Sequence, residues 1–319
     1  ITDAQGMSLD LWTLTNSSEF IVYPYFKAKQ YTITLKVNED IVNYEIVKKV
    51  VFGQSFIFEY SELWEKISDG TVKDAYPVEY FCGWETAGGV RITDDSGTGA
   101  KWNVADNITL YAIWPTFINS QAEFDTLFVN NNDNLSKSYA LNCNINITKP
   151  IGDSENPYTG VFIGVGNNTV TLNISSIYDG YIGMVAYNQG TIKNVNLNST
   201  INIANTSSVT KDIYLGSVAG RNDGRIISTL TGIENKVSIF INFVPNNNHA
   251  YIGGIVGEST GTIQDLSCEI NTITININGN PYQIGENITA GSLVGNLESG
   301  NVIGKDAKYY YYASNRLND

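Results

Sequence analysis

The chain has 319 residues and a formal net charge of -13, because 32 acidic residues stand against 19 basic ones. This balance opposes binding to nucleic acid or to an anionic membrane surface. No apolar run approaches the roughly 18 residues that a membrane-spanning helix needs. Charged residues are only 16% of the chain while Asn, Gly, Ser and Thr are abundant, which is typical of a turn-rich β protein.

In the first third, hydrophobic alternation and turn residues predict the order strand, strand, helix, strand, strand. Residues 31–37 alternate with a period of two, and a second strand follows over residues 44–51. Ser61 is the expected N-cap of a short helix that Gly70 stops. Two further strands are expected within residues 80–84 and 107–114.

Three stretches of this segment carry a family pattern: Tyr-Thr-Ile-Thr-Leu at 31–35, Phe-Cys-Gly-Trp at 81–84, and the closing strand at 107–114. They resemble the extracellular Listeria-Bacteroides repeat, known from the B repeat of internalins. The resemblance implies a small β-grasp-like module, repeated in tandem on bacterial surface proteins. The sequence departs from the family after the first strand, where Asn38-Glu39-Asp40 replaces the usual glycine-rich stretch.

Residues 1–30 repeat the pattern of the end of this module. Ile1-Thr2-Asp3 with Trp12 matches Ile92-Thr93-Asp94 with Trp102. We therefore expect residues 1–30 to be the C-terminal part of a preceding B-type repeat, and the chain to be a fragment of a longer array. The alternative is a coincidental pair of strands.

The composition changes near Pro115. Five asparagines and all five tryptophans precede it, whereas 33 asparagines and no tryptophan follow. We therefore expect a B-type repeat over residues 31–115 and a different architecture over residues 116–319. Ser120 and Glu123 have the spacing of a capping box, which predicts a short helix that closes the N-terminal end of that architecture. Strands are expected at 139–147, 159–162 and 169–174.

One short phrase, Tyr-Ile-Gly or a variant of it, recurs four times in the second part. Its glycines, Gly183, Gly216, Gly253 and Gly291, are 33, 37 and 38 residues apart. Such a period is typical of solenoids, here with about three strands per unit. Aligning the units predicts two apolar ladders, Ile182/Leu215/Ile252/Ala290 and Val185/Val218/Ile255/Leu293, and places Cys268 in the position of Leu197.

The phrases Gly253-Gly254-Ile255-Val256-Gly257 and Gly291-Ser292-Leu293-Val294-Gly295, each followed by a polar turn, resemble the GLUG repeat. Such repeats occur in large bacterial surface and secreted proteins. The resemblance covers about residues 117–305 and carries no catalytic residues. We expect a mainly β chain: β-grasp-like modules, then a right-handed parallel β-helix with a short N-terminal capping helix.

Few residues point to chemistry. The three cysteines, Cys82, Cys143 and Cys268, are far apart and odd in number, so they predict no disulfide framework. No metal-binding, nucleophile or phosphate-loop motif is present, so we expect no cofactor and no metal. The one acidic row, Asp223, Glu258 and Glu298, is expected to consist of solvated turn carboxylates; a weak Ca²⁺ site or catalysis are the alternatives.

Tyr181, Tyr214 and Tyr251 occupy the same position in successive units, beside inward-facing aliphatic residues. The two-residue pleat should turn them outward into a stacked column. This column is the candidate binding site, for a host or cell-surface protein or a glycan; stacking that only stabilises the units is the alternative. We expect a non-enzymatic, monomeric fragment of an extracellular surface or secreted protein. A carbohydrate-active β-helix and a purely structural spacer are the competing hypotheses.

Overall fold

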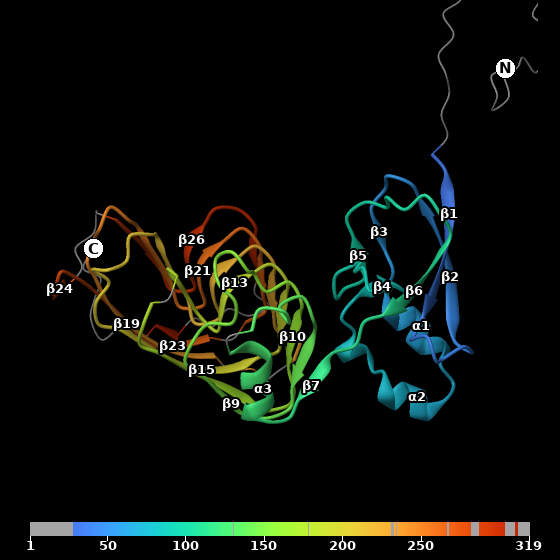
Figure 1. Ribbon diagram of the computed structural model, residues 1–319, viewed down its shortest axis with the longest axis horizontal. Helices are drawn as coiled ribbons and strands as arrows, with labels where there is room; N and C mark the ends of the chain where they lie inside the picture. The colour runs from blue at the N-terminus through green and yellow to red at the C-terminus, as the bar shows by residue number, and fades with distance from the viewer. Residues whose placement is uncertain are drawn as a thin grey trace, which may run out of the picture.

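The computed structural model describes residues 28–303, apart from 130, 178, 231–232, 234, 267 and 282–286, and also residues 310–311. The expected preceding repeat, except its last three residues, lies outside the described residues. The described part is mainly β, and its parallel sheets are compatible with a β-helix or solenoid. Figure 1 shows two parts joined at β7, and each has its own apolar core.

The N-terminal part is built on a four-stranded sheet in the order β2-β1-β6-β4. β1 pairs antiparallel with β2 and parallel with β6, and β4 runs antiparallel to β6. The elements are β1 (Gln30–Lys36), β2 (Glu45–Val51), β3 (Phe56–Ile57), α1 (Tyr60–Lys66), α2 (Gly70–Ala75), the 3-10 helix η1 (Val78–Tyr80), β4 (Trp84–Thr86), β5 (Thr98–Gly99) and β6 (Ile108–Ala112).

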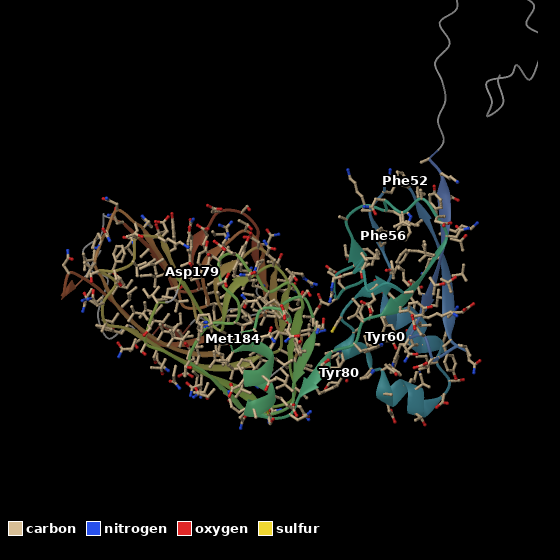
Figure 2. The ribbon with its side chains drawn as sticks, in the orientation of Figure 1. Phe52, Phe56, Tyr60, Tyr80, Asp179 and Met184 are labelled. Atoms are coloured by element: carbon tan, nitrogen blue, oxygen red, sulfur yellow. The ribbon has the colours of Figure 1, made fainter. Side chains whose placement is uncertain are left out.

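Aromatic side chains fill the core of this part. Trp84 is fully buried, and its indole donates to the carbonyl of Phe58 at 2.6 Å. Tyr60 stacks on Phe81 with ring centroids 5.1 Å apart. The four described tryptophans, Trp64, Trp84, Trp102 and Trp114, all lie in this core or pack against it, so the residues that distinguish this part by composition act as packing residues. Figure 2 shows Phe56 and Tyr60 inside it.

The two predicted helix boundaries are wrong. α1 begins at Tyr60, so Ser61 lies inside the helix and Glu59 is the N-cap, without a side-chain capping bond. Gly70 does not end the helical segment but is the first residue of α2. The true cap is Asp69, whose carboxylate accepts from the backbone N–H groups of Thr71 and Val72. Asp69 stabilises α2 by satisfying amides that have no partner within the helix.

The second part stacks repeating units into four sheets, which we number I to IV. Sheet I holds β7 (Thr116–Ile118), β8 (Tyr139–Leu141), β10 (Val161–Gly164), β14 (Thr191–Lys193), β18 (Arg225–Ile227), β22 (Thr262–Gln264) and β27 (Asn301–Ile303). Sheet II holds β9 (Ile145–Ile147), β11 (Thr169–Ile174), β15 (Asn196–Ile203), β19 (Asn235–Phe243), β23 (Cys268–Ile277) and β24 (Asn280–Pro281), with β28 (Tyr310–Tyr311) also paired to β23.

Sheet III holds β12 (Tyr181–Ile182), β16 (Ile213–Leu215), β20 (Ala250–Gly253) and β25 (Ile288–Gly291). Sheet IV holds β13 (Val185–Asn188), β17 (Ala219–Asn222), β21 (Val256–Ser259) and β26 (Val294–Leu297). Each complete unit therefore contributes four strands, not the expected three. The difference arises because each phrase is divided between two sheets: one strand ends at or just before the phrase glycine, and the next begins two or three residues after it. The backbone is tightly packed there, since a Cβ on Gly216 would lie 2.5 Å from the carbonyl oxygens of Ala219 and Ile255.

The first predicted ladder is confirmed, since Ile182 pairs with Leu215, Leu215 with Ile252, and Ile252 with Ala290. Cys268 occupies the position of Leu197 through Asn235, which pairs with both. The second ladder is wrong by one residue, because it runs Val185/Ala219/Val256/Val294. The turn between sheets III and IV spans residues 183–184 in the first unit but 216–218 in the next, which shifts the register.

A helix covers the start of the stack, as expected. α3 (Gln121–Phe128) begins after Ser120, whose hydroxyl accepts from the Glu123 N–H, while the Glu123 carboxylate accepts from Asn119 N–H instead of completing the box on Ser120. Phe124 and Phe128 of this helix are buried in the core. The expected single strand over residues 139–147 is instead two, β8 and β9, which belong to different sheets.

The two parts pack against each other along sheet I. β10 is buried on both faces: Phe162 points into the stack, whereas Val161 and Ile163 join Cys82 and Ala140 in a separate apolar cluster between the parts. Tyr80, which Figure 2 shows at this junction, contacts Phe117 edge to face at 5.3 Å. The N-terminal part therefore covers part of the outer face of sheet I and keeps apolar side chains there out of water.

Candidate functional site

The three predicted tyrosines form one continuous column on sheet III. Tyr181 pairs with Tyr214, and Tyr214 with Tyr251. Their ring centroids are 4.7 Å and 5.0 Å apart, close to the spacing of neighbouring strands. All three side chains are half-buried, and the residues that follow them in sequence point into the core. The alignment of the repeats therefore located this column correctly.

Ring stacking decides how a ligand can approach the column. Tyr214 lies between Tyr181 and Tyr251, with interplanar angles of 31° and 12°, so both of its faces are occupied. His249 packs on Tyr251 at 4.6 Å, and Tyr187 approaches Tyr181 at 6.1 Å. A ligand therefore meets ring edges and hydroxyl groups instead of open aromatic faces. Partial burial raises the pKa of the three column phenols, so they remain neutral hydroxyls that can donate and accept.

A charged cluster lies beside the column on sheet IV. Arg221 links two carboxylates: its Nε is 3.1 Å from Asp223 and its Nη1 is 3.2 Å from Glu258. The guanidinium also lies over the Tyr187 ring, 5.5 Å from its centroid, and the Tyr187 hydroxyl donates to Asp223. Register places Tyr187, Arg221 and Glu258 at equivalent positions of successive strands.

The expected row of solvated carboxylates is therefore wrong for two of its three members. The Glu258 side chain is only 3% exposed, and Asp223 is half-buried; Glu298 alone is exposed. Neither burial nor pairing with Arg221 was visible in the sequence, because both depend on which turns lie side by side. The repeat alignment did bring the two carboxylates into neighbouring units.

The environment moves the two carboxyl pKa values in opposite directions. Burial raises the pKa of Glu258 above its ordinary value, although Asn296 and Arg221 act against this. Burial also acts to raise the pKa of Asp223, but hydrogen bonds from Tyr187, Thr260 and Arg221 outweigh it and lower that pKa. Opposed shifts of this kind occur in acid–base pairs of enzymes.

Access argues against such chemistry here. One oxygen of Glu258 is held by Arg221 and the other accepts from the Asn296 amide at 3.1 Å. A proton donor must reach the substrate within hydrogen-bonding distance, and this carboxylate has almost no exposed surface. The cluster instead connects four neighbouring strands, β13, β17, β21 and β26, through side-chain hydrogen bonds and two ion pairs.

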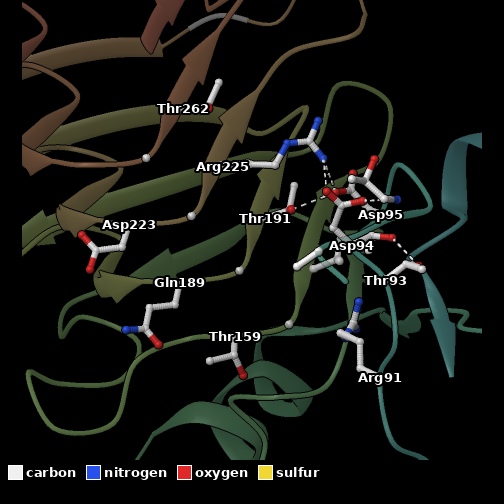
Figure 3. A pocket seen from close by; sticks show the side chains of 18 of the residues that line it. Arg91, Thr93, Asp94, Asp95, Thr159, Gln189, Thr191, Asp223, Arg225 and Thr262 are labelled. Atoms are coloured by element: carbon white, nitrogen blue, oxygen red, sulfur yellow. Dashed lines mark hydrogen bonds and ion pairs between the residues drawn. The ribbon is translucent and has the colours of Figure 1, made fainter. Parts of the chain in front are cut away.

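A second feature, which the sequence did not predict, is a cleft of about 510 Å³ between the two parts (Figure 3). Loop residues 91–100 form one wall, and turns of the stack form the other. Asp95 anchors the loop: its carboxylate accepts from the Thr191 hydroxyl at 2.9 Å and from Arg225 at 2.7 Å. Its partners lie roughly a hundred positions away in sequence, so no local pattern could have indicated the contact.

Among the described residues, no group of three His, Cys, Asp or Glu side chains is close enough to hold a metal ion. The helices in the same part of the chain are all too short or too polar to cross a membrane. Comparison with known proteins gave no match to a family model, to a curated protein or to a solved structure.

Proposed function

We propose that this chain is a non-enzymatic segment of an extracellular bacterial surface or secreted protein, in which a repeat module and a right-handed parallel β-helix bind or display a ligand. The observation that carries the proposal is the in-register column of Tyr181, Tyr214 and Tyr251 on the outside of the stack. Identical side chains at a constant spacing suit a partner that itself repeats, such as a glycan chain, or a flat protein surface.

The finer fold assignments belong to the same proposal. The stretches that resemble the Listeria-Bacteroides repeat fall on β1, β4 and β6 of one small sheet, which supports a β-grasp-like module. The GLUG-like phrases supply sheets III and IV, and glycine is needed there: a Cβ on Gly253 would lie 2.0 Å from the Val256 carbonyl oxygen. The parallel pairing of equivalent strands supports a β-helix.

A purely structural spacer is the second candidate, and the closed ring stacking favours it. Each ring contact stabilises the stack by about 0.5–1.5 kcal/mol beyond burial, which is sufficient reason for tyrosine at these positions. The carbohydrate-active hypothesis has weaker support, because its best carboxylate, Glu258, is enclosed.

Two triple variants separate binding from stacking. Replacing all three tyrosines by Phe keeps the rings and removes the hydroxyls, whereas replacing them by Ser removes both. If the column binds, the Phe variant loses binding to a glycan array or to host cells while its melting temperature stays near that of the parent chain. Tyr111→Phe, on β6 of the N-terminal part, is the matched control. Unchanged binding in both triple variants would assign the column to stability alone.

A further inference from the structure

The cleft between the two parts has the size and position of a ligand site. About 510 Å³ lies within the range of small-molecule pockets, and such pockets are concentrated at boundaries between domains. Among the described residues, its lining mixes polar side chains and backbone with a few apolar residues, such as Ile92 and Val161, and contains no aromatic ring. We propose that this cleft binds a neutral oligosaccharide through its hydroxyl groups, at a site separate from the tyrosine column.

Charge balance selects a neutral ligand. Arg91 and Arg225 contribute two positive charges to the lining, and Asp94 and Asp95 contribute two negative ones. Asp223, the remaining charged residue of the lining, is paired with Arg221. A strongly anionic or cationic ligand would therefore meet no excess of the opposite charge in the cleft. A neutral polar ligand needs no such excess, because it brings no net charge that must be desolvated.

A donor and an acceptor lie side by side in the wall. Arg225 donates through Nη1 to Asp95, but its partly exposed guanidinium has further N–H groups and lies beside the Asp94 carboxylate, with 3.6 Å between Nη1 and Oδ2, too long for a hydrogen bond. The two side chains are 30% and 37% exposed. A sugar hydroxyl donates and accepts at once, so adjacent hydroxyls can bind both groups. On the wall formed by the second part, Thr262 and the exposed Thr159 add hydroxyl groups to the lining.

Three glycines leave one wall of the cleft without side chains at their positions. Gly190, Gly224 and Gly261 belong to the lining. Each of these turns packs directly on the turn before it. A Cβ on Gly190, Gly224 or Gly261 would lie 2.0–2.1 Å from the carbonyl oxygen of the equivalent glycine of the preceding unit. No side chain can therefore project there, which leaves a surface with the spacing of successive strands, about 4.8 Å.

The opposite wall is held in place before any ligand arrives. The Asp95 side chain is 3% exposed and joins the loop to Thr191 and Arg225. Asp94 Oδ1 accepts from the N–H groups of Ser96 and Thr98, which fixes the loop internally. A preorganised wall loses little conformational entropy on binding, which favours affinity for a flexible sugar chain.

Bulky substitutions at the rim test the proposal. The full chain is applied to an array of neutral and acidic oligosaccharides, and the strongest neutral binder is then titrated calorimetrically. Thr262→Trp and Thr159→Trp should weaken that binding by about tenfold or more by filling the cleft. Thr200→Trp, on the outer face of sheet II, is the matched control and should bind like the parent chain. Thermal melts verify that each variant folds.

The outcomes are distinct from those of the tyrosine experiment. The triple Phe variant should keep neutral-sugar binding in the cleft. A chain that binds no neutral oligosaccharide, or binds only acidic ones, overturns the proposal. So does unchanged affinity in both folded Trp variants, because the sugar would then be bound elsewhere.

Discussion

Arg225 of the stack donates to the carboxylate of Asp95 in the N-terminal part, with 2.7 Å between Nη1 and Oδ1 and 130 positions of sequence between the residues. Lys193 reaches the Glu79 carbonyl, and Arg91 reaches the Ser138 hydroxyl at 3.0 Å. These polar contacts and the apolar cluster around Cys82 and Val161 therefore join the two parts.

Removing one member of this pair should destabilise the chain strongly. Arg225→Ala leaves the buried Asp95 carboxylate with only Thr191, which we expect to lower the free energy of unfolding by about 2–4 kcal/mol. Asp95→Ala added to Arg225→Ala should recover part of the loss, since no unpaired buried charge remains. Chemical denaturation measures both variants. Lys211→Ala, which breaks an exposed pair with Asp179, should have little effect.

The close packing of the glycine turns predicts that replacing a glycine there by alanine destabilises the chain. Gly224→Ala places a Cβ 2.1 Å from the Gly190 carbonyl oxygen and 2.7 Å from the Gln189 carbonyl carbon, so the backbone itself must move. We expect a loss of at least about 3 kcal/mol or failure to fold. Gly70→Ala is the control, because no atom lies within 4 Å of its Cβ and it begins a helix. That variant should be neutral or slightly stabilising, and a Gly224→Ala chain of parental stability would contradict the close packing of the turns.

Helix capping supplies a third prediction. Ser120→Ala removes the bond to the Glu123 N–H and should cost about 1 kcal/mol in urea denaturation. Ser61→Ala should change stability far less, because Ser61 lies within α1 and caps nothing. Equal losses in the two variants would restore the sequence-based assignment of Ser61 as a cap.

The charged cluster predicts a specific pH dependence. Asp223 has a folded-state pKa below its ordinary value of 3.8, so the unfolded chain binds a proton more readily. Its contribution is therefore complete above that value and is lost as the pH falls through the folded-state pKa. Asp223→Asn should make stability fall less steeply below about pH 4. Melting temperatures of the parent chain and the variant, measured from acidic to neutral pH, give the dependence of stability on pH.

Glu258 should act in the opposite sense. Its folded-state pKa lies above its ordinary value of 4.5, so its contribution is present at lower pH and is lost as the pH rises through the folded-state value. In the parent chain, protonation of Glu258 should therefore stabilise the fold as the pH falls toward 4.5. Glu258→Gln removes this contribution, so the free energy of unfolding should decrease more steeply with acidification in the variant. Identical pH profiles for Asp223→Asn and Glu258→Gln would contradict the opposed environments.

The sequence alone determined the parts of this protein that repeat. The positions of Ile182, Leu215 and Ile252 follow from aligning the phrase, and so does the tyrosine column. This worked because parallel strands in register place equivalent residues one strand apart. Cys268 could be assigned to the apolar interior for the same reason, with no structural information.

Only the tertiary structure decided the features that depend on packing between distant segments. Val161 and Ile163 lie on the outer face of sheet I, yet they are buried because the N-terminal part covers them. The sequence predicts Glu258 to be a solvated turn carboxylate, but Arg221 and Asn296 of neighbouring strands enclose it. The cleft is lined by both parts and lies where Asp95 pairs with Arg225. Local propensity and periodicity contain no term for such long-range contacts, whereas they determine strands and their inward faces directly.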